Sequence, residues 1–193
     1  MKKLVILLFV LVLAGPALAR DEVLIGGDIE SGGYGALTVR YGRILGADGV
    51  FVGGQGGWII NHSFVIGGGG YGLANNIGIQ DCDYLYLGFG YGGLLLEYII
   101  ASQKLVHFSV QVLVGAGGIS YFTNDYHCEY NPYDSDAFFA LEPGANLMLN
   151  LHKYVRVGIG ATYRYIGGAD YDGITDSDLS GFSGGMIFKF GSF

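Results

Sequence analysis

Three polar side chains, His107, Ser109 and Glu142, are of the types that combine in acyl-transfer chemistry. A catalytic triad is recognised by its geometry, so the residue types alone do not establish one. Interior polar residues that hydrogen-bond to one another are the favoured interpretation. We therefore predict that the protein is not an enzyme, and acyl transfer remains an alternative.

Acidic side chains gather in four segments that we interpret as long loops. In the last of these, Asp170, Asp172, Asp176 and Asp178 surround a glycine and could offer hard oxygen ligands to Ca²⁺. Their spacing does not match an EF-hand, and a solvated acidic rim is the favoured interpretation, so no cofactor is expected and Ca²⁺ is an alternative. The four segments hold eleven of the 17 acidic residues: Asp48, Asp81, Asp83, Asp125, Glu129, Asp134, Asp136, Asp170, Asp172, Asp176 and Asp178.

The two cysteines, Cys82 and Cys128, fall in the second and third of these loops. His127, Asp81 and Asp83 stand beside them and would suit a metal site. In an oxidising compartment, however, a disulfide between the two cysteines is favoured. Such a bond would order the rim.

The N-terminus indicates export to such a compartment. Lys2 and Lys3 precede the apolar run 4–14, and small residues at Ala17 and Ala19 suit cleavage before Arg20. The run is too short to remain as a membrane span. We predict a signal peptide over 1–19 and a periplasmic N-terminal segment over 20–32.

The composition argues against an ordinary soluble domain. Hydrophobic residues make up 51% of the chain and charged residues only 14%, whereas soluble domains carry about 25% charged residues. The 36 glycines, together with 15% aromatic residues, suit a narrow, strongly curved sheet better than a disordered chain.

Segments rich in β-branched and aromatic residues recur at a regular spacing with turn residues between them. We predict eight strands, at about 33–43, 49–60, 63–74, 84–98, 105–122, 138–150, 154–166 and 180–193. The connections between them alternate between long and short. The sequence therefore predicts an all-β fold, an eight-stranded antiparallel up-and-down β-barrel over 33–193, whose strands are long enough to cross a bilayer.

Alternation within the strands separates an apolar face from a polar one. In 105–122, Val106, Phe108 and Val110 alternate with His107 and Ser109. Charges within the strands are too few for a hydrated exterior, which favours an apolar face toward lipid over a soluble lipocalin-like carrier. The polar residues predicted to face the lumen are Arg40, His107, Gln111, Glu142, Asn146, Arg156, Arg164 and Lys189.

Aromatic residues near the predicted strand ends suit the girdles of a membrane barrel. They are Tyr34, Tyr41, Trp58, Tyr98, Tyr121, Tyr154 and Tyr165. With the signal, the eight-strand rhythm, the loop asymmetry and the terminal Phe193, the chain resembles the small eight-stranded outer-membrane barrels, the group that includes the OmpA transmembrane domain and OmpX. One departure is that Phe190, Phe188 and Met186 are out of phase with Phe193.

The resemblance implies an outer-membrane protein of a Gram-negative bacterium with a structural or surface-interaction role, porin-like in architecture. Its acidic loops carry Tyr126, Tyr130, Tyr133 and Tyr171. The partners that this implies are outer-membrane lipid, lipopolysaccharide and the barrel-insertion machinery during biogenesis. No nucleic-acid partner is expected, and the sequence does not identify an extracellular ligand. The alternatives are a lipid A-modifying enzyme of the acyl-transfer or deacylase kind, a narrow ion channel and a soluble carrier.

Overall fold

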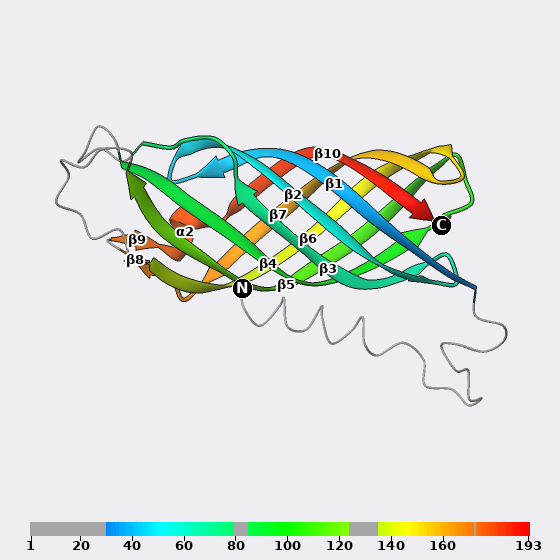
Figure 1. Ribbon diagram of the computed structural model, residues 1–193, viewed down its shortest axis with the longest axis horizontal. Coiled ribbons are helices and arrows are strands. Elements are labelled where there is room, and N and C mark those ends of the chain that lie inside the picture. The colour runs from blue at the N-terminus through cyan, green and yellow to red at the C-terminus, as the bar shows by residue number, and fades with distance from the viewer. Residues whose placement is uncertain (1–29, 79–84, 124–134, 172) are drawn as a thin grey trace, which may run out of the picture.

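The protein is a closed antiparallel β-barrel in a computed structural model that describes residues 30–78, 85–123, 135–171 and 173–193. The barrel strands are β1 (Ser31–Ile44), β2 (Ala47–Ile60), β3 (Phe64–Leu73), β4 (Leu85–Ile100), β5 (Val106–Thr123), β6 (Ser135–His152), β7 (Val155–Gly167) and β10 (Gly181–Ser192). Each strand pairs with its neighbour in sequence, and β10 pairs with β1 (Figure 1). The predicted eight-stranded up-and-down fold is confirmed.

The closing pair, β1 and β10, leaves the sheet without a free edge. Its register runs from Gly33 opposite Ser192 to Gly42 opposite Ser183. An edge strand exposes unpaired backbone groups, which would be costly in a bilayer because no water is available there to satisfy them. Closure satisfies those groups within the sheet.

The two ends of the barrel differ. The first, called here the turn end, holds Phe193 and the short turns 61–63, 101–105 and 153–154. The second, the loop end, holds a small hairpin, β8 (Asp170–Tyr171) with β9 (Ile174–Thr175), and the one-turn helix α2 (Asp176–Leu179). Figure 1 shows these three elements at the opposite end from the C-terminus.

The predicted alternation of long and short connections is wrong at its first member. Instead of a long loop over 44–48, the chain makes a two-residue turn at Leu45 and Gly46, where the φ angles are 53° and 73°. Two-residue hairpin turns need positive φ, because the turn must match the right-handed twist of the strands. Asp48 and Asp136, predicted to lie in loops, are in β2 and β6.

The outer wall of the barrel is apolar. Large hydrophobic side chains such as Leu37, Phe108, Ile159 and Phe182 are 64%, 58%, 59% and 74% exposed on it. In the same strands, the charged side chains other than that of Arg43, near the end of β1, are buried inside, so the polar face lines the lumen and the apolar face points outward. They are Arg40, Arg156, Arg164 and Lys189. A soluble carrier of apolar cargo would have the opposite arrangement.

The predicted aromatic girdle holds for most of its members. Tyr41, Trp58, Tyr98, Tyr154 and Tyr165 point outward and are about half exposed. Tyr34 and Tyr121 instead point into the lumen, because each lies on the inward parity of its strand. Among the described residues, no helix has the length and apolar character needed to cross a membrane.

Candidate functional site

Two buried ion pairs lie in the lumen. Lys189 Nζ is 2.5 Å from Glu97 Oε1, and Arg40 Nη1 is 2.5 Å from Glu142 Oε1. All four side chains are at least nine-tenths buried. Buried charges are costly unless they are paired and hydrogen-bonded. Within each pair, the cation and the carboxylate therefore offset each other's cost of burial.

A chain of hydrogen bonds connects these pairs across the lumen. Tyr34 donates to Glu97 over 2.6 Å and accepts from Gln55 Nε2 at 3.2 Å. Tyr71 donates to Gln55 Oε1 over 2.6 Å and accepts from Arg40 Nη2 at 2.9 Å. The four strands β1, β2, β3 and β4 are thereby tied through side chains as well as through their ladders.

A branch of the network reaches the opposite wall. Gln55 Nε2 donates to Gln111 Oε1 at 3.3 Å, and Asn146 Nδ2 donates to the same oxygen at 3.1 Å and to Ser109 Oγ at 3.2 Å. Tyr91 donates to the second oxygen of Glu142. The middle of the lumen is therefore filled by mutually bonded side chains.

The residues of the acyl-transfer alternative do not form a hydrogen-bonded set. Among the residues that the structure describes, His107 Nδ1 has no hydrogen-bond partner, and Ser109 Oγ accepts from Asn146 Nδ2. Asn146 lies opposite Ser109 in the sheet, and Glu142 is four residues farther along β6, roughly 13 Å at about 3.3 Å per residue. Glu142 is bound by Arg40 instead.

The loop end is closed by α2 and the β8–β9 hairpin. The fully buried Arg164 donates from Nε to the Leu179 carbonyl at 2.8 Å and from Nη2 to the Arg43 carbonyl at 3.1 Å. Its guanidinium stacks over the Phe51 ring, with Cζ 4.3 Å from the ring centroid. Leu179 itself is fully buried in the apolar cluster of this half of the barrel.

Several loop-end carboxylates bind backbone amides. Asp176 Oδ1 accepts from Ala169 N at 2.8 Å, and Asp178 Oδ2 accepts from Thr175 N at 2.9 Å and from Thr175 Oγ1 at 2.7 Å. These hydrogen bonds from the Thr175 side chain and backbone lower the pKa of Asp178 below its usual value. Asp170 N donates to Asp136 Oδ2 at 2.9 Å.

The predicted calcium site and disulfide stay predictions. Asp172 lies outside the described residues, and within them no three His, Cys, Asp or Glu side chains gather as a metal site would require. Cys82 and Cys128 also lie outside the described residues.

The polar residues predicted to face the lumen are all buried within the barrel. Exposed fractions are 0–7% for Arg40, His107, Gln111, Glu142, Asn146, Arg156, Arg164 and Lys189. Sequence reasoning missed the lumen roles of Gln55, Tyr34, Tyr71 and Tyr91. Gln55 and Tyr71 lie in glycine-rich strands, where the alternation that identifies an inward position is hidden.

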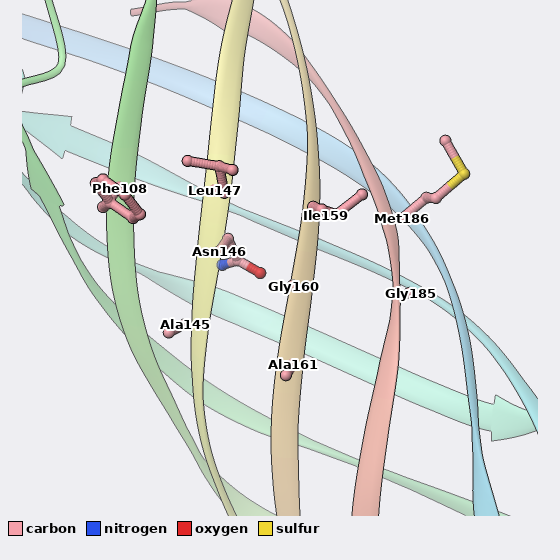
Figure 2. Close-up of a pocket in the computed structure, with 9 residues that line it drawn as sticks. All are labelled: Phe108, Ala145, Asn146, Leu147, Ile159, Gly160, Ala161, Gly185 and Met186. Carbon is pink, nitrogen blue, oxygen red and sulfur yellow. The ribbon is translucent and has the colours of Figure 1, made fainter.

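An apolar groove of about 610 Å³ runs across the outer wall of β5, β6, β7 and β10. Figure 2 shows larger apolar side chains in a row across these strands, with Ala145 and Ala161 to one side of the row. Its lining is Phe108, Ala145, Asn146, Leu147, Ile159, Gly160, Ala161, Gly185 and Met186.

A second, more polar pocket of about 400 Å³ lies at the turn end. Phe193 lines it, stacks on Tyr34 with ring centroids 6.2 Å apart, and lies under the Arg156 guanidinium at 4.0 Å. The out-of-phase terminal aromatic therefore packs over the mouth of the lumen, and Phe190 is the outward aromatic near the end of β10. The other lining residues are His62, Ser102, Gln103, Asn150, Leu151, His152 and Lys153.

The closed wall, the apolar exterior and the charged interior together define the architecture of the small eight-stranded outer-membrane barrels. Among solved structures, the chain is similar to Neisserial surface protein A (NspA), with a TM-score of 0.61, 14% identity and coverage of 86% of this chain and 99% of that one. The N-terminal β-barrel domain of Pseudomonas aeruginosa OprF has a TM-score of 0.51 at 11% identity, covering 82% and 96% of the two chains.

A third similar structure is Ail, the attachment invasion locus protein of Yersinia pestis, in complex with the heparin analogue sucrose octasulfate. Its TM-score is 0.51 at 13% identity, with coverage of 86% of this chain and 99% of that one. No protein-family model and no curated protein sequence matches the chain. At these identities the likeness shows the fold: the chain has the fold of the small eight-stranded outer-membrane barrels, as its sequence predicts.

Proposed function

We propose that the protein lies in the outer membrane of a Gram-negative bacterium as a barrel without an open pore, with a structural and surface-interaction role. The observation that carries this is the opposite polarity of its two faces. Apolar side chains cover the outside. Inside, Arg40 is paired with Glu142, and Lys189 is paired with Glu97. Only a bilayer makes that arrangement favourable, because water would leave the apolar wall exposed.

The filled lumen supports a closed barrel over the ion-channel alternative. An eight-stranded barrel is just wide enough for its own side chains to fill it. Here the hydrogen-bonded network fills the middle and apolar clusters lie on both sides of it. A conducting path would have to break buried ion pairs. The distance of Glu142 from His107 and Ser109 along the sheet likewise gives the acyl-transfer alternative no support.

The location is tested by expressing the full chain with its N-terminal segment and separating inner from outer membranes. We expect the protein in the outer-membrane fraction, and we expect heated and unheated samples to migrate differently on a detergent gel. Planar bilayers that contain the folded protein should show no stepwise conductance. A monodisperse protein in detergent-free buffer, or regular conductance steps, would contradict the proposal.

The surface-interaction part concerns the loop end, which in this orientation faces the exterior. This part of the proposal is supported by the acidic rim of the loop end and by the ordered structure beneath it. Leu45 N donates to the Asp178 carbonyl at 2.8 Å, which anchors α2 to the barrel. Replacing residues 125–133 with a Gly-Ser segment of equal length should abolish protein-dependent cell retention on a glycan or protein array. The heat-dependent gel shift of the barrel should persist, and unchanged retention would assign recognition elsewhere.

A further inference from the structure

We propose that the turn-end pocket and the apolar wall groove together bind one glycerophospholipid, with its phosphate at Arg156 and Lys153 and an acyl chain along the wall. This site rests on the proposed function, because such a lipid is available only to a barrel in a bilayer. The pocket would take the headgroup of the inner leaflet, the leaflet that faces the turn end.

Arg156 is the first reason to place an anion in the pocket. Its side chain is 7% exposed, yet its one described hydrogen bond is a long 3.5 Å contact from Nη2 to the Ser102 carbonyl. A guanidinium carries five N–H donors and binds phosphate in a bidentate manner. Stacking on Phe193 holds the guanidinium plane in place while leaving its edge for a ligand.

The charges around the pocket are the second reason. Within the described residues, no carboxylate lies within 4.0 Å of Arg156 or Lys153, whereas Arg40 and Lys189 each have one. Glu30, at the same end, is engaged by His62. A largely buried cation with no carboxylate in direct contact is costly, so a phosphate bound here would stabilise the folded barrel.

Arg164, the other buried cation of the described barrel without a carboxylate partner, differs in its surroundings. It donates to two backbone carbonyls, those of Leu179 and Arg43, and lies beneath the loop-end cap. Arg156 instead lines a pocket to which Ser102 and Gln103 also contribute. The two arginines therefore have different roles, one structural and one open to a ligand.

The apolar wall supplies the third reason and favours a lipid over free phosphate. Leu151 lines the pocket and is 59% exposed, and with Leu149 and Leu147 it forms an outward row on β6. Leu147 lines the wall groove together with Ala145 and Ala161. The row spans four residues, roughly 13 Å. A basic pocket joined to an apolar track matches an amphiphile, and basic pockets at membrane interfaces bind lipid headgroups elsewhere.

Native mass spectrometry of the folded full chain in dodecyl maltoside tests the site. The probes are dioleoylphosphatidylglycerol, dioleoylglycerol, which lacks phosphate, and inorganic phosphate. We expect one retained phosphatidylglycerol per barrel, at least about tenfold weaker binding of dioleoylglycerol, and weak binding of inorganic phosphate. Charge-assisted hydrogen bonds are large enough to give that factor.

Two variants separate the head and chain contributions. Arg156→Gln should weaken phosphatidylglycerol binding at least about tenfold, and the matched control Arg43→Gln, an exposed cation at the loop end, should leave it unchanged. Ala161→Trp should fill the groove and weaken binding roughly fourfold, the equivalent of one buried methylene group. Its control is Val52→Trp, an outward position on β2. If Arg156→Gln does not fold, Lys153→Gln, whose side chain is exposed, provides the same comparison.

Equal affinity of Arg156→Gln and Arg43→Gln would overturn the site, as would equal retention of the two lipids. Inorganic phosphate that binds as tightly as phosphatidylglycerol would reassign the pocket to a free anion. An intact, heat-shifted barrel that retains no lipid overturns the site alone. Absence of the heat-shifted species in the unaltered protein would overturn the proposed function, and the site with it.

Discussion

Charge compensation inside the lumen sets the largest single-residue effects that we expect. Lys189→Met would leave Glu97 buried without its cation, and breaking a buried pair costs about 3–5 kcal/mol of unfolding free energy. The double variant Lys189→Met/Glu97→Leu should recover most of that loss, because replacing both charges by apolar groups is often neutral. Urea unfolding in lipid vesicles measures both.

The exposed pair between Arg43 and Asp48 is the control for this comparison. Its atoms are 3.7 Å apart and both side chains are more than half exposed, so Arg43→Met should cost less than about 1 kcal/mol. A double variant as unstable as Lys189→Met alone would show that the Tyr34 hydrogen bond to Glu97, rather than charge, supplies the stability.

A smaller residue-scale effect concerns Asp178 at the start of α2. Its pKa is lowered by the two hydrogen bonds from Thr175, so the carboxylate stabilises the folded loop fully above the usual pKa of about 3.9. That stabilisation is lost as the pH falls through the lowered value. The protection factors of the amides of residues 173–180, taken relative to the intrinsic exchange rate at each pH, should therefore fall at low pH.

Asp178→Asn serves as the comparison for that pH effect. The amide cannot ionise, so exchange in this segment should be faster than in the unaltered protein at neutral pH and should show no carboxylate transition at low pH. An identical transition in both proteins would assign the effect to another acid of the loop end, such as Asp176, which accepts from Ala169 N.

Inward residues could be predicted from sequence where the alternation is uninterrupted. Arg156 and Arg164 alternate with apolar neighbours in β7, so their placement could be predicted. Gln55 and Tyr71 sit among glycines, which carry no side chain to show the parity, so the centre of the network was missed. Which lumen groups pair was also not predictable, because pairing depends on the register between strands.

Close strand approach is the main constraint at the scale of the elements. A Cβ on Gly185 would lie 2.1 Å from the Val39 carbonyl oxygen across the closing β1–β10 pair, whereas a Cβ on the adjacent Gly184 would meet nothing closer than 3.6 Å. Gly185→Ala should therefore lower the unfolding free energy by roughly 1–3 kcal/mol, the usual range for overpacking.

Gly184→Ala is the matched control, one residue away on the outward face, and should fold as the unaltered protein does. The two variants can be compared by the urea midpoint and by the yield of heat-shifted barrel after refolding. Equal urea midpoints of the two variants would mean that β1 and β10 can move apart enough to admit a methyl group at little cost. Glycine would then not be needed at position 185 to close the barrel.

The strands were predicted to within about three residues, whereas the connections were not. Strand-forming segments are long, and their composition is distinctive. The turn at Leu45 and Gly46 lacks the Asn-Gly or Asp-Gly signal of a two-residue hairpin, so β1 and β2 were predicted too short. The elements β8, β9 and α2 are two to four residues long and depend on contacts with Arg164 and the barrel rim, which no local pattern contains.

At the scale of the whole molecule, the fold was predictable because the strand pattern and the charge content of the sequence independently indicate the same structure. Strand number and length suit a bilayer crossing, and the scarcity of charge leaves only a lumen to hold the polar face. The closed ends were not predictable. Phe193 covers the turn end and Leu179 lies inside the loop end, and each depends on an arginine, Arg156 or Arg164, placed by the barrel itself.

The orientation of the two faces can be measured directly, because Trp58 is the chain's only tryptophan. It points outward near the turn end of β2 and is 50% exposed. In vesicles its fluorescence should be quenched most strongly by lipids brominated near the headgroup, and little by aqueous acrylamide. In the double variant Trp58→Phe/Phe89→Trp, the reporter moves to a lumen position that is 6% exposed, and lipid quenching should fall sharply. Stronger lipid quenching of the lumen reporter than of Trp58 would mean that the apolar wall does not face the bilayer.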